Sequence, residues 1–283
     1  MKKLLILVTM IFVSSLTYAE TAREIMQKVD DRDNGDTMIS RVTLTTFRYV
    51  KKGKKMAPAE KPRVKMMDTV LKDYGPKGKD HKSVSIILKP QSEKGIGFLQ
   101  YDWDDPNRET DQWLYLSAMG KIKRIVSGND DEPKTGSFFG SELSYEDMES
   151  INIDEYKYKI LGSEKYRKRD CWVIQSVPLP KRARKSNYSK TMIWVDKERF
   201  MDLKAILFNR NGKKVKKIYF KNIKKINGIF VVGKIVANNI ETRRVTNMVY
   251  NNIRINSKVE DKFLTQRTLT DKGFRTRNLK KYQ

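Results

Sequence analysis

The side chains able to carry acid–base or nucleophilic chemistry are few. The only histidine, His81, lies in a polar turn before an expected strand, and the only cysteine, Cys171, precedes Trp172 in an apolar one. His81 has no evident partner for acid–base work, and Cys171 lacks the exposed, electropositive setting of a reactive thiol. One cysteine excludes an intramolecular disulfide, and one Cys with one His cannot build a zinc site. We interpret His81 as incidental and Cys171 as a small buried side chain.

Carboxylates cluster at three places, none of which has the spacing of a metal loop. A calcium loop needs acids at alternating positions and a closing bidentate acid. The chain also has no phosphate-cradling glycine loop and no nucleophile elbow. We therefore expect no enzyme activity, no catalytic residue, no cofactor and no metal. The clusters are Asp102/Asp104/Asp105, Asp130-Asp131-Glu132 and Glu146-Asp147-Glu149.

The N-terminus predicts export. Lys2 and Lys3 precede an apolar run over residues 4–13, and small residues at Thr17 and Ala19 suit cleavage before Glu20. A run of about ten residues is too short to span a bilayer as a helix, which disfavours the alternative of an uncleaved anchor. No cysteine stands near the cleavage site to carry a lipid. Residues 1–19 are thus predicted to be a cleaved signal peptide, and the mature chain to be a soluble periplasmic protein.

The chain is strongly basic, with 59 Lys and Arg against 34 Asp and Glu and a formal net charge of +25. The lysines are spread along nearly every segment, with local runs at residues 51–55, 213–217 and 221–225. No nucleic-acid motif accompanies them, so nucleic acid is not an expected partner. A solvated surface and transient attraction to acidic lipid head groups stay open as readings of this charge.

The periodicity predicts one helix followed by many strands. Thr21 and Glu24 form a capping box before an apolar stripe that ends near Val29. Residues 181–190 are expected to be irregular, and residues 270–283 to form a loose basic tail. The expected strands are residues 38–49, 63–74, 82–89, 95–103, 111–116, 121–126, 156–162, 171–177, 191–196, 200–209, 213–222, 229–239 and 242–255.

Strands at such short spacing favour one large antiparallel sheet. A flat twisted sheet of this size must curl or split, so we expect a mainly β (α+β) half-open barrel covered by helices and loops, with residues 20–269 as a single domain. A curled sheet either fills its interior with side chains or encloses a ligand. The many methionines and aromatics suit both, and spacing alone leaves core-filling and cavity-lining open.

The chain is organised around residues 111–147. Asp111-Gln112-Trp113-Leu114-Tyr115-Leu116 and Lys123-Arg124-Ile125 read as a hairpin, and Ser137-Phe138-Phe139-Gly140-Ser141 places large rings in a connection. With Ser144-Tyr145-Glu146-Asp147, Tyr188-Ser189-Lys190, Trp194-Val195-Asp196 and Phe263-Leu264-Thr265, this set resembles the outer-membrane lipoprotein-sorting family, the LolA-like proteins. Ser117 and Phe139 depart from it, where the family commonly has proline and methionine.

The resemblance implies a carrier. Such proteins hold acyl chains in an apolar cavity and ferry lipid or lipoprotein across the periplasm, and this branch resembles partners of RND-type (MMPL-like) inner-membrane exporters. It implies a monomer, lipid or lipoprotein cargo, an outer-membrane acceptor and a role in outer-membrane biogenesis. The alternative is a non-carrier periplasmic module that binds an anionic envelope component or membrane complex.

The predicted ligand-binding residues come from the same stretch. Phe138 and Phe139 are expected to form a movable lid, Trp113 and Tyr115 to line or brace the mouth of the cavity, and Arg124 to meet an anionic head group. Tyr145 completes the set. For each ring the alternative is core packing under a fixed cap.

Overall fold

Strands dominate the structure. The computed structural model describes residues 20–53, 55–75, 77–127 and 132–282, so the expected signal peptide and Asp130-Asp131 lie outside it. The strands are β1 (Thr37–Lys52), β2 (Lys55–Pro58), β3 (Arg63–Tyr74), β4 (Asp80–Lys89), β5 (Gly97–Asp102), β6 (Asp111–Leu116), β7 (Lys121–Ile125), β8 (Tyr156–Tyr166), β9 (Arg169–Pro178), β10 (Tyr188–Asp196), β11 (Met201–Asn209), β12 (Lys214–Lys221), β13 (Lys224–Ile226), β14 (Ile229–Val231), β15 (Lys234–Asn239) and β16 (Arg244–Ile255). The helices are α1 (Ala22–Asp30), α2 (Pro180–Lys185), α3 (Gln266–Thr270) and α4 (Lys272–Tyr282), with short 3₁₀ turns η1 (Gln91–Glu93), η2 (Phe138–Gly140), η3 (Glu146–Met148), η4 (Ile153–Glu155) and η5 (Asp261–Phe263).

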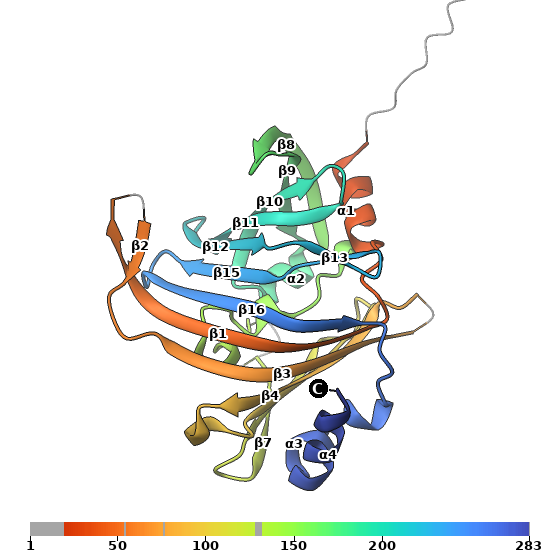
Figure 1. Ribbon diagram of the computed structural model, residues 1–283. Helices are drawn as coiled ribbons and strands as arrows, with labels where there is room; N and C mark the ends of the chain where they lie inside the picture. The colour runs from red at the N-terminus through yellow and green to blue at the C-terminus, as the bar shows by residue number, and fades with distance from the viewer. Residues whose placement is uncertain (1–19, 54, 76, 128–131, 283) are drawn as a thin grey trace, which may run out of the picture.

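One antiparallel sheet of 14 strands runs through the described residues (Figure 1). Its order is β7-β6-β5-β4-β3-β1-β16-β15-β12-β11-β10-β9-β8, with β2 paired to β1. In this part of the chain β7 and β8 are the ends of the order, so the sheet does not close on itself. The expected mainly β, half-open architecture is confirmed.

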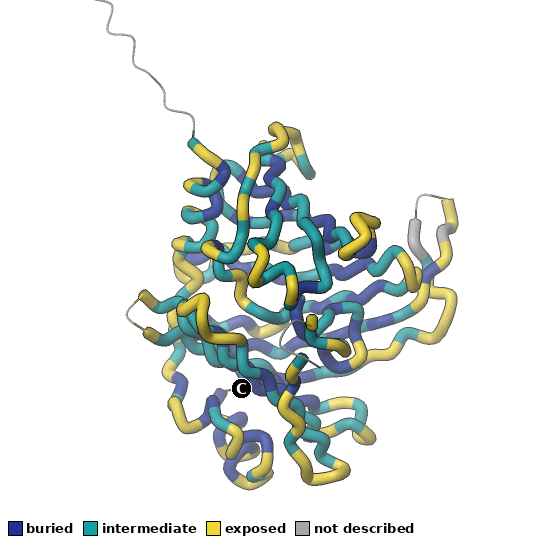
Figure 2. Tube along the Cα trace, turned by 180° about the vertical axis from the view of Figure 1, so that it is seen from behind, coloured by how far each residue is buried: buried dark blue, intermediate teal, exposed yellow. Residues whose placement is uncertain are grey.

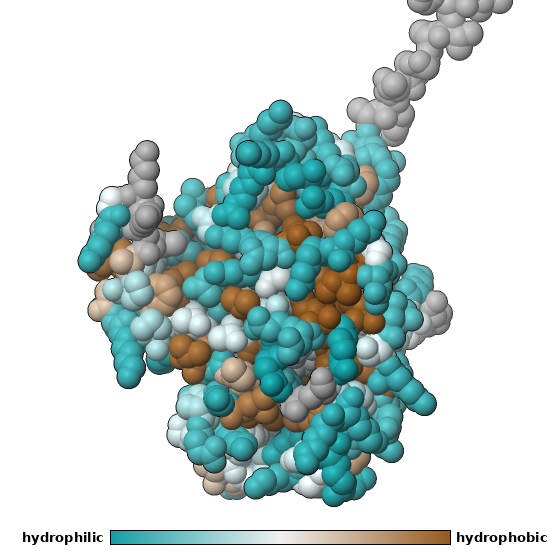
Figure 3. All heavy atoms as spheres, viewed as in Figure 1, coloured by the Kyte–Doolittle hydropathy of each residue, from teal (hydrophilic) through white to brown (hydrophobic). Residues whose placement is uncertain are grey.

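The sheet is curved, and one of its faces is enclosed. Phe98 of β5 and Leu207 of β11 stand seven positions apart in the strand order, yet both belong to one buried cluster. A sheet this wide must curl, and this face, here called the inner face, lies inside the curve. Viewed from behind, buried residues follow the strands while exposed ones gather at turns and on the edges (Figure 2). On the face seen in Figure 1, hydrophilic residues predominate and hydrophobic ones gather in patches between them (Figure 3). The inner face is therefore the main core of the molecule.

The first helix covers the inner face of the last strands. The predicted capping box is present, because Thr21 Oγ1 accepts from the Glu24 N–H and the Glu24 carboxylate accepts from the Thr21 N–H. Ile25 of α1 packs in a buried cluster with Ile174 of β9 and Ile193 of β10. The apolar stripe read from the sequence is thus core packing.

The C-terminal residues cover the opposite, outer face of β3–β5. Leu99 of β5 lies in a buried cluster with Leu269 of α3 and with Phe274, Leu279 and Tyr282 of α4. The expectation of a loose tail after Thr270 is wrong, because residues 272–282 form a helix whose Phe274, Leu279 and Tyr282 are buried against the sheet.

Gly97 allows the C-terminal segment to come close. A Cβ at this position would lie 2.7 Å from Leu269 Cδ2 and 2.8 Å from Ile86 Cδ1. Real Cβ contacts are longer than this, so a larger residue would push α3 away from the sheet.

Three local expectations are corrected. The polar link between the expected strands 156–162 and 171–177 is a tight turn, with Arg167 and Lys168 both at positive φ (52° and 67°). Such turns are usually marked by Asn-Gly, and Arg167-Lys168 carries no such signal. The expected strand 229–239 is broken before Lys234 into β14 and β15, and residues 180–185 form α2 rather than irregular chain.

Candidate functional site

Aromatic side chains of one connection fill the centre of the inner face. Residues 134–153 link β7 to β8 and are called the plug segment below. Phe138, Phe139 and Tyr145 of this segment are buried. The ring of Phe98 on β5 stacks on Tyr145 with centroids 5.7 Å apart and meets the edge of Phe138 at 5.3 Å. The plug segment therefore occupies the middle of the half-barrel with its own rings.

The backbone of the plug segment is tightly constrained. The Phe138 N–H donates to the Leu143 carbonyl at 2.9 Å. Phe139 has φ 49° and ψ 34°, a left-handed conformation that bulky residues rarely adopt. At Gly136, with φ 103°, a Cβ would lie 2.7 Å from Tyr145 Cε2, so only glycine fits beneath this ring. Backbone strain of this kind persists where the surroundings hold it, and it concentrates at binding sites and switches.

Glu146 fastens the plug segment to the chain that follows α2. Its carboxylate accepts from the backbone N–H of Asn187 at 2.8 Å, from Asn187 Nδ2 at 2.7 Å and from the Ser186 hydroxyl. Arg182 Nη2 lies 3.3 Å from the same carboxylate. Burial raises the pKa of Glu146 above its ordinary value, although Arg182 and these donors favour the ionised form.

A second fastening joins the plug segment to β12. Lys216 and Asp147 form an ion pair in which 8% and 2% of the side chains are exposed. The Tyr188 hydroxyl donates to Asp147 Oδ1 at 2.8 Å, and the Ser144 N–H donates to Oδ2 at 2.7 Å. Burial raises the pKa of Tyr188, which keeps the phenol neutral and able to donate. The Asp147 carboxylate is thus well satisfied away from bulk water.

Two glutamines hold the plug segment to β5 and β6. Gln112 Nε2 of β6 donates to the Tyr145 carbonyl at 3.0 Å. Gln100 Nε2 of β5 donates to the Met148 carbonyl at 2.6 Å. The Tyr145 carbonyl also accepts from the Met148 N–H, so the glutamines add side-chain contacts to the backbone of this 3₁₀ turn. The segment is therefore tied to both halves of the curved sheet.

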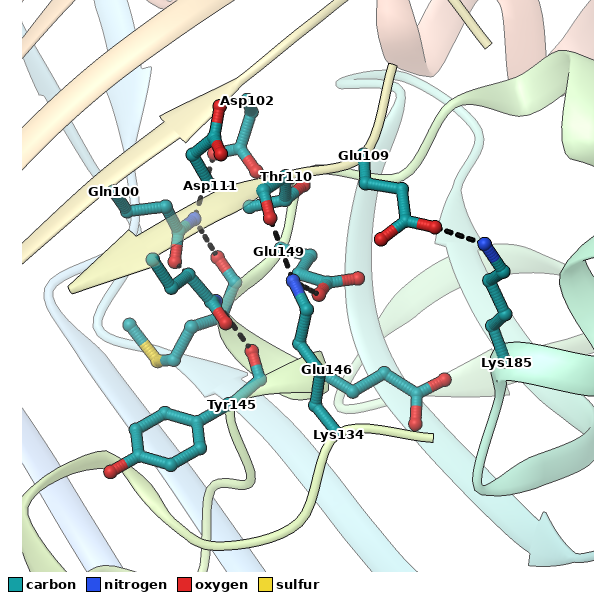
Figure 4. A network of polar contacts seen from close by, with 12 residues as sticks. Gln100, Asp102, Glu109, Thr110, Asp111, Lys134, Tyr145, Glu146, Glu149 and Lys185 are labelled. Atoms are coloured by element: carbon teal, nitrogen blue, oxygen red, sulfur yellow. Dashed lines mark hydrogen bonds and ion pairs between the residues drawn. The ribbon is translucent and has the colours of Figure 1, made fainter. Parts of the chain in front are cut away.

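Lys134, the first residue of the plug segment, makes polar contacts with Thr110 and Glu149. Lys134 Nζ donates to the Thr110 carbonyl at 2.7 Å and pairs with Glu149 Oε1 at 2.9 Å. Figure 4 shows Lys134 reaching between these two groups, while Lys185 meets Glu109 separately. Polar contacts thus surround the aromatic centre of the plug segment.

Two hollows flank the plug segment. The inner hollow, about 160 Å³, lies between the plug segment and β9–β12, and the mouth hollow, about 560 Å³, lies beside α1. Asp202 of β11 lines both. Ligand sites usually measure about 300–1,000 Å³, so only the mouth hollow reaches that size while the plug segment stays in place. The apolar side chains around the inner hollow are Ile151, Pro178, Ile193, Ala205, Leu207, Ile218 and Phe220.

The predicted site residues separate into two groups. Phe138, Phe139 and Tyr145 meet on the inner face. Trp113 and Tyr115 pack with the cluster beneath the C-terminal helices on the outer face. Strand alternation explains this, because neighbouring residues of a strand point to opposite faces. The structure therefore does not bring Trp113 and Tyr115 to the hollow beside the aromatic plug.

Arg124 also lies away from the inner face. It opposes Trp113 across β6 and β7, is largely exposed, and donates from Nη2 to Asp111 Oδ1 at 2.5 Å. Arg124 is absent from the described linings of both the inner hollow and the mouth hollow. Its expected contact with an anionic head group stays a prediction of the sequence.

Four residues of the site were missed from the sequence: Arg182, Tyr188, Asp202 and Lys216. Asp202 carried a readable signal, since it is an acid between the apolar residues Met201 and Leu203 of a strand. Tyr188 belonged to a segment of the family resemblance. Arg182 and Lys216 looked like ordinary members of basic runs, and only the tertiary fold reveals their burial.

The remaining chemistry-bearing residues have structural surroundings. Cys171 is fully buried, as expected, and burial raises its thiol pKa. His81 Nδ1 lies 2.7 Å from Asp73 Oδ1. Among the described residues, no group of three or more His, Cys, Asp or Glu side chains is arranged to hold a metal ion. Over the same ranges, no helix has the length and apolar character needed to cross a membrane.

Solved structures share this architecture. A DUF1329 family protein from Desulfovibrio piger is 24% identical with a TM-score of 0.78, covering 88% of this chain and 97% of that one. A domain from Vibrio parahaemolyticus described as an outer membrane lipoprotein-sorting protein is 26% identical with a TM-score of 0.76, covering 88% and 98%. A LolA superfamily protein from Nitrosomonas europaea is 20% identical with a TM-score of 0.63, covering 87% and 98%.

The open antiparallel half-barrel with an enclosed apolar face defines a LolA-like protein, and the resemblance expected from the sequence is confirmed. A family model described as "-like: Uncharacterized protein" matches residues 79–271. The matched range exceeds half of the 283 residues, and the chain belongs to that family. No curated protein matches the sequence.

Proposed function

We propose that the protein carries lipid or lipoprotein acyl chains on its inner face, in the space that the plug segment now fills. The observation behind this is the composition of that face. Buried apolar side chains from many strands gather on it, and its central contacts are made by Phe138, Phe139, Leu143 and Tyr145 of a connection, rather than by a second sheet. A connection can move away without dismantling the strands. In this proposal the described position of the plug segment is the closed one.

An acyl chain on the inner face would replace the apolar contacts that are lost when the plug segment moves away. Each buried CH₂ group contributes about 0.8 kcal/mol, so a chain placed against Phe98 and Leu207 would replace apolar contacts that Phe138 and Tyr145 give up. The polar fastenings at Glu146 and Asp147 would set how easily the segment opens. A carrier of this kind needs only differential burial, with no catalytic group and no cofactor.

The cellular route is part of the same proposal. Residues 1–19 would direct export and be cleaved, and the mature protein would work in the periplasm as a monomer without a lipid anchor. An RND-type inner-membrane exporter would deliver the cargo and an outer-membrane acceptor would receive it. The family resemblance supports this route, and the similar Vibrio parahaemolyticus domain is described as an outer membrane lipoprotein-sorting protein.

Two measurements test carriage. Protein purified from its native periplasm, then extracted for mass spectrometry, should release acyl-bearing molecules. A Leu143→Cys variant, with the new thiol buried in the plug segment, should react with maleimide faster once a fluorescent fatty acid is added. Cys171 is an internal control, because its fully buried thiol should stay unreactive in the parent protein. No bound lipid and no change in labelling would overturn the proposal.

A non-carrier interaction module is the second candidate. One observation favours it: lysines lie over aromatic rings on the outer face of β10–β12, with Lys204 Nζ 3.4 Å from the Trp194 ring centre and Lys221 Nζ 5.4 Å from that of Tyr219. Such a surface suits an anionic envelope component. Lys204→Glu with Lys221→Glu should abolish envelope binding if the module is the function, and should leave lipid recovery unchanged if carriage is.

A further inference from the structure

The mouth hollow is acidic although the chain is strongly basic. The whole sequence carries a formal net charge of +25. In the lining of this hollow, however, the permanently charged cations are Arg32, Lys77 and Lys79. Such a concentration of one sign in a concave site attracts the opposite charge. The lining contains eight aspartates: Asp30, Asp31, Asp33, Asp36, Asp73, Asp104, Asp154 and Asp202.

Several of these acids already have partners in the wall. Lys79 Nζ pairs with Asp30 and lies 2.6 Å from Asp31 Oδ1. His81 shares a hydrogen bond with Asp73, and although burial lowers the His81 pKa, this bond and the neighbouring carboxylates raise it overall. These pairs build the wall of the hollow and need no ligand.

Asp202 is different. It stands where the mouth hollow meets the inner hollow, and its Oδ1 is buried with no hydrogen-bond partner among the described residues. Arg32 acts on it electrostatically, but the Arg32 guanidinium donates to the Phe230 carbonyl at 2.9 Å and to Asn34 Oδ1. Burial raises the pKa of Asp202 to about 6, so the carboxylate is ionised at neutral pH. A buried charge left in this state is unfavourable until a cation meets it.

We propose that Asp202 binds a protonated primary amine in the polar end of an acyl-bearing ligand. This inference rests on the proposed carrier function and adds the chemistry of the head group. The wide acidic mouth hollow accommodates the polar end, and the inner hollow beyond Asp202, walled by Ile193, Leu207 and Ile218, leads the chain toward the inner face. A ligand with an anionic polar end would meet the aspartates of the mouth and lose the ion pair.

Competition binding on the whole mature protein tests the proposal. The probes are lysophosphatidylethanolamine, dodecylamine and lysophosphatidylglycerol, each below its micelle concentration and each displacing a fluorescent fatty acid. The two amines should bind at least about tenfold more tightly than the anionic lipid, the size of effect expected for one buried ion pair. Binding of dodecylamine alone would show that the amine suffices, and binding of lysophosphatidylethanolamine alone would show that the phosphate is also read.

The Asp202→Asn variant tests whether this carboxylate causes the preference for amines. It should lose the preference for amines, with lysophosphatidylglycerol bound equally well or better. Asp170→Asn, at an exposed position of β9, should keep the preference. If Asp202→Asn is insoluble, the preference of the unaltered protein for amine probes over the anionic lipid still tests the proposal. Equal binding of amine and anionic probes, or an unchanged preference in Asp202→Asn, would overturn the head-group inference while leaving carriage intact. Failure of every probe to bind would instead count against the proposed function.

Discussion

Lys216 of β12 and Asp147 of the plug segment form a buried ion pair across 69 residues of sequence. The pair lies beside the inner hollow, where the Tyr188 hydroxyl donates to the same carboxylate. It joins the plug segment to the sheet. Since apolar contacts alone allow the plug segment many nearly equivalent positions, this directional contact specifies one of them.

Removing one member of this pair should destabilise the protein strongly. Lys216→Met leaves the Asp147 charge buried without its cation, which costs about 3–5 kcal/mol of unfolding free energy. The double variant Lys216→Met with Asp147→Asn should recover a large part of that loss, because no buried charge is left over. Lys217→Met is the control, since its side chain lies on the other face and should change stability by less than about 0.5 kcal/mol. Urea unfolding measures all three, and equal losses in the single and double variants would contradict this account.

Shortening Phe138 should weaken the fold and strengthen ligand binding together. Phe138 is 1% exposed, and a Phe→Ala change at such a site costs about 3–5 kcal/mol. The space left behind adjoins the apolar inner face, so a fluorescent fatty acid should bind severalfold more tightly to Phe138→Ala. Phe208→Ala, on the outer face under Lys190, should lose stability without gaining affinity. Weaker binding by Phe138→Ala would mean that the ring is a ligand contact and not a plug.

The sequence was informative wherever local chemistry decides the outcome. The capping box at Thr21 and Glu24 placed α1, and the alternation of residues 63–74 placed β3 at both ends. The Asn211-Gly212 pair marked the turn between β11 and β12. Each of these features depends on residues close together in the chain, and for that reason a single sequence reveals them.

Which face of a strand points inward was beyond the reach of the sequence. In β6, Trp113 and Leu114 are both apolar, so alternation separates two faces without saying which is enclosed. The outer face is apolar there because α4 covers it, and α4 has the composition of a basic tail. The ion pair between Asp147 and Lys216 could not be predicted either, because only the curvature of the sheet brings these two residues together. Because the cover provided by α4 was not expected, the sequence could not reveal that Trp113 packs on the outer face.

The packing of α4 yields a prediction of its own. Leu279 is 7% exposed against the outer face, so Leu279→Ala should lower the unfolding free energy by about 2–5 kcal/mol. Loosening the helix should also alter the fluorescence of Trp113, which packs with the same cluster. Lys280→Ala changes the next, exposed residue and should leave both signals unchanged. A stability equal to that of the parent would mean that α4 does not hold to the sheet in solution.

Asp202 should make stability depend on pH in a specific direction. Its folded pKa of about 6 lies above the unfolded value of about 3.9. The stabilisation linked to its proton is thus complete below about pH 4 and is lost as pH rises through about 6. Asp202→Asn should therefore be more stable than the parent at neutral pH, by about 2–3 kcal/mol for a shift near two pKa units, and the advantage should vanish near pH 4.

Urea unfolding of Asp202→Asn and Asp170→Asn across this pH range measures the effect, with Asp170→Asn expected to follow the parent throughout. Dodecylamine should narrow the gap at neutral pH, because the amine relieves in the parent the same unpaired charge that the asparagine removes. A parent protein as stable as Asp202→Asn at neutral pH without ligand would mean that the carboxylate is already compensated in the folded chain. The physical reason for an amine at this site would then be gone.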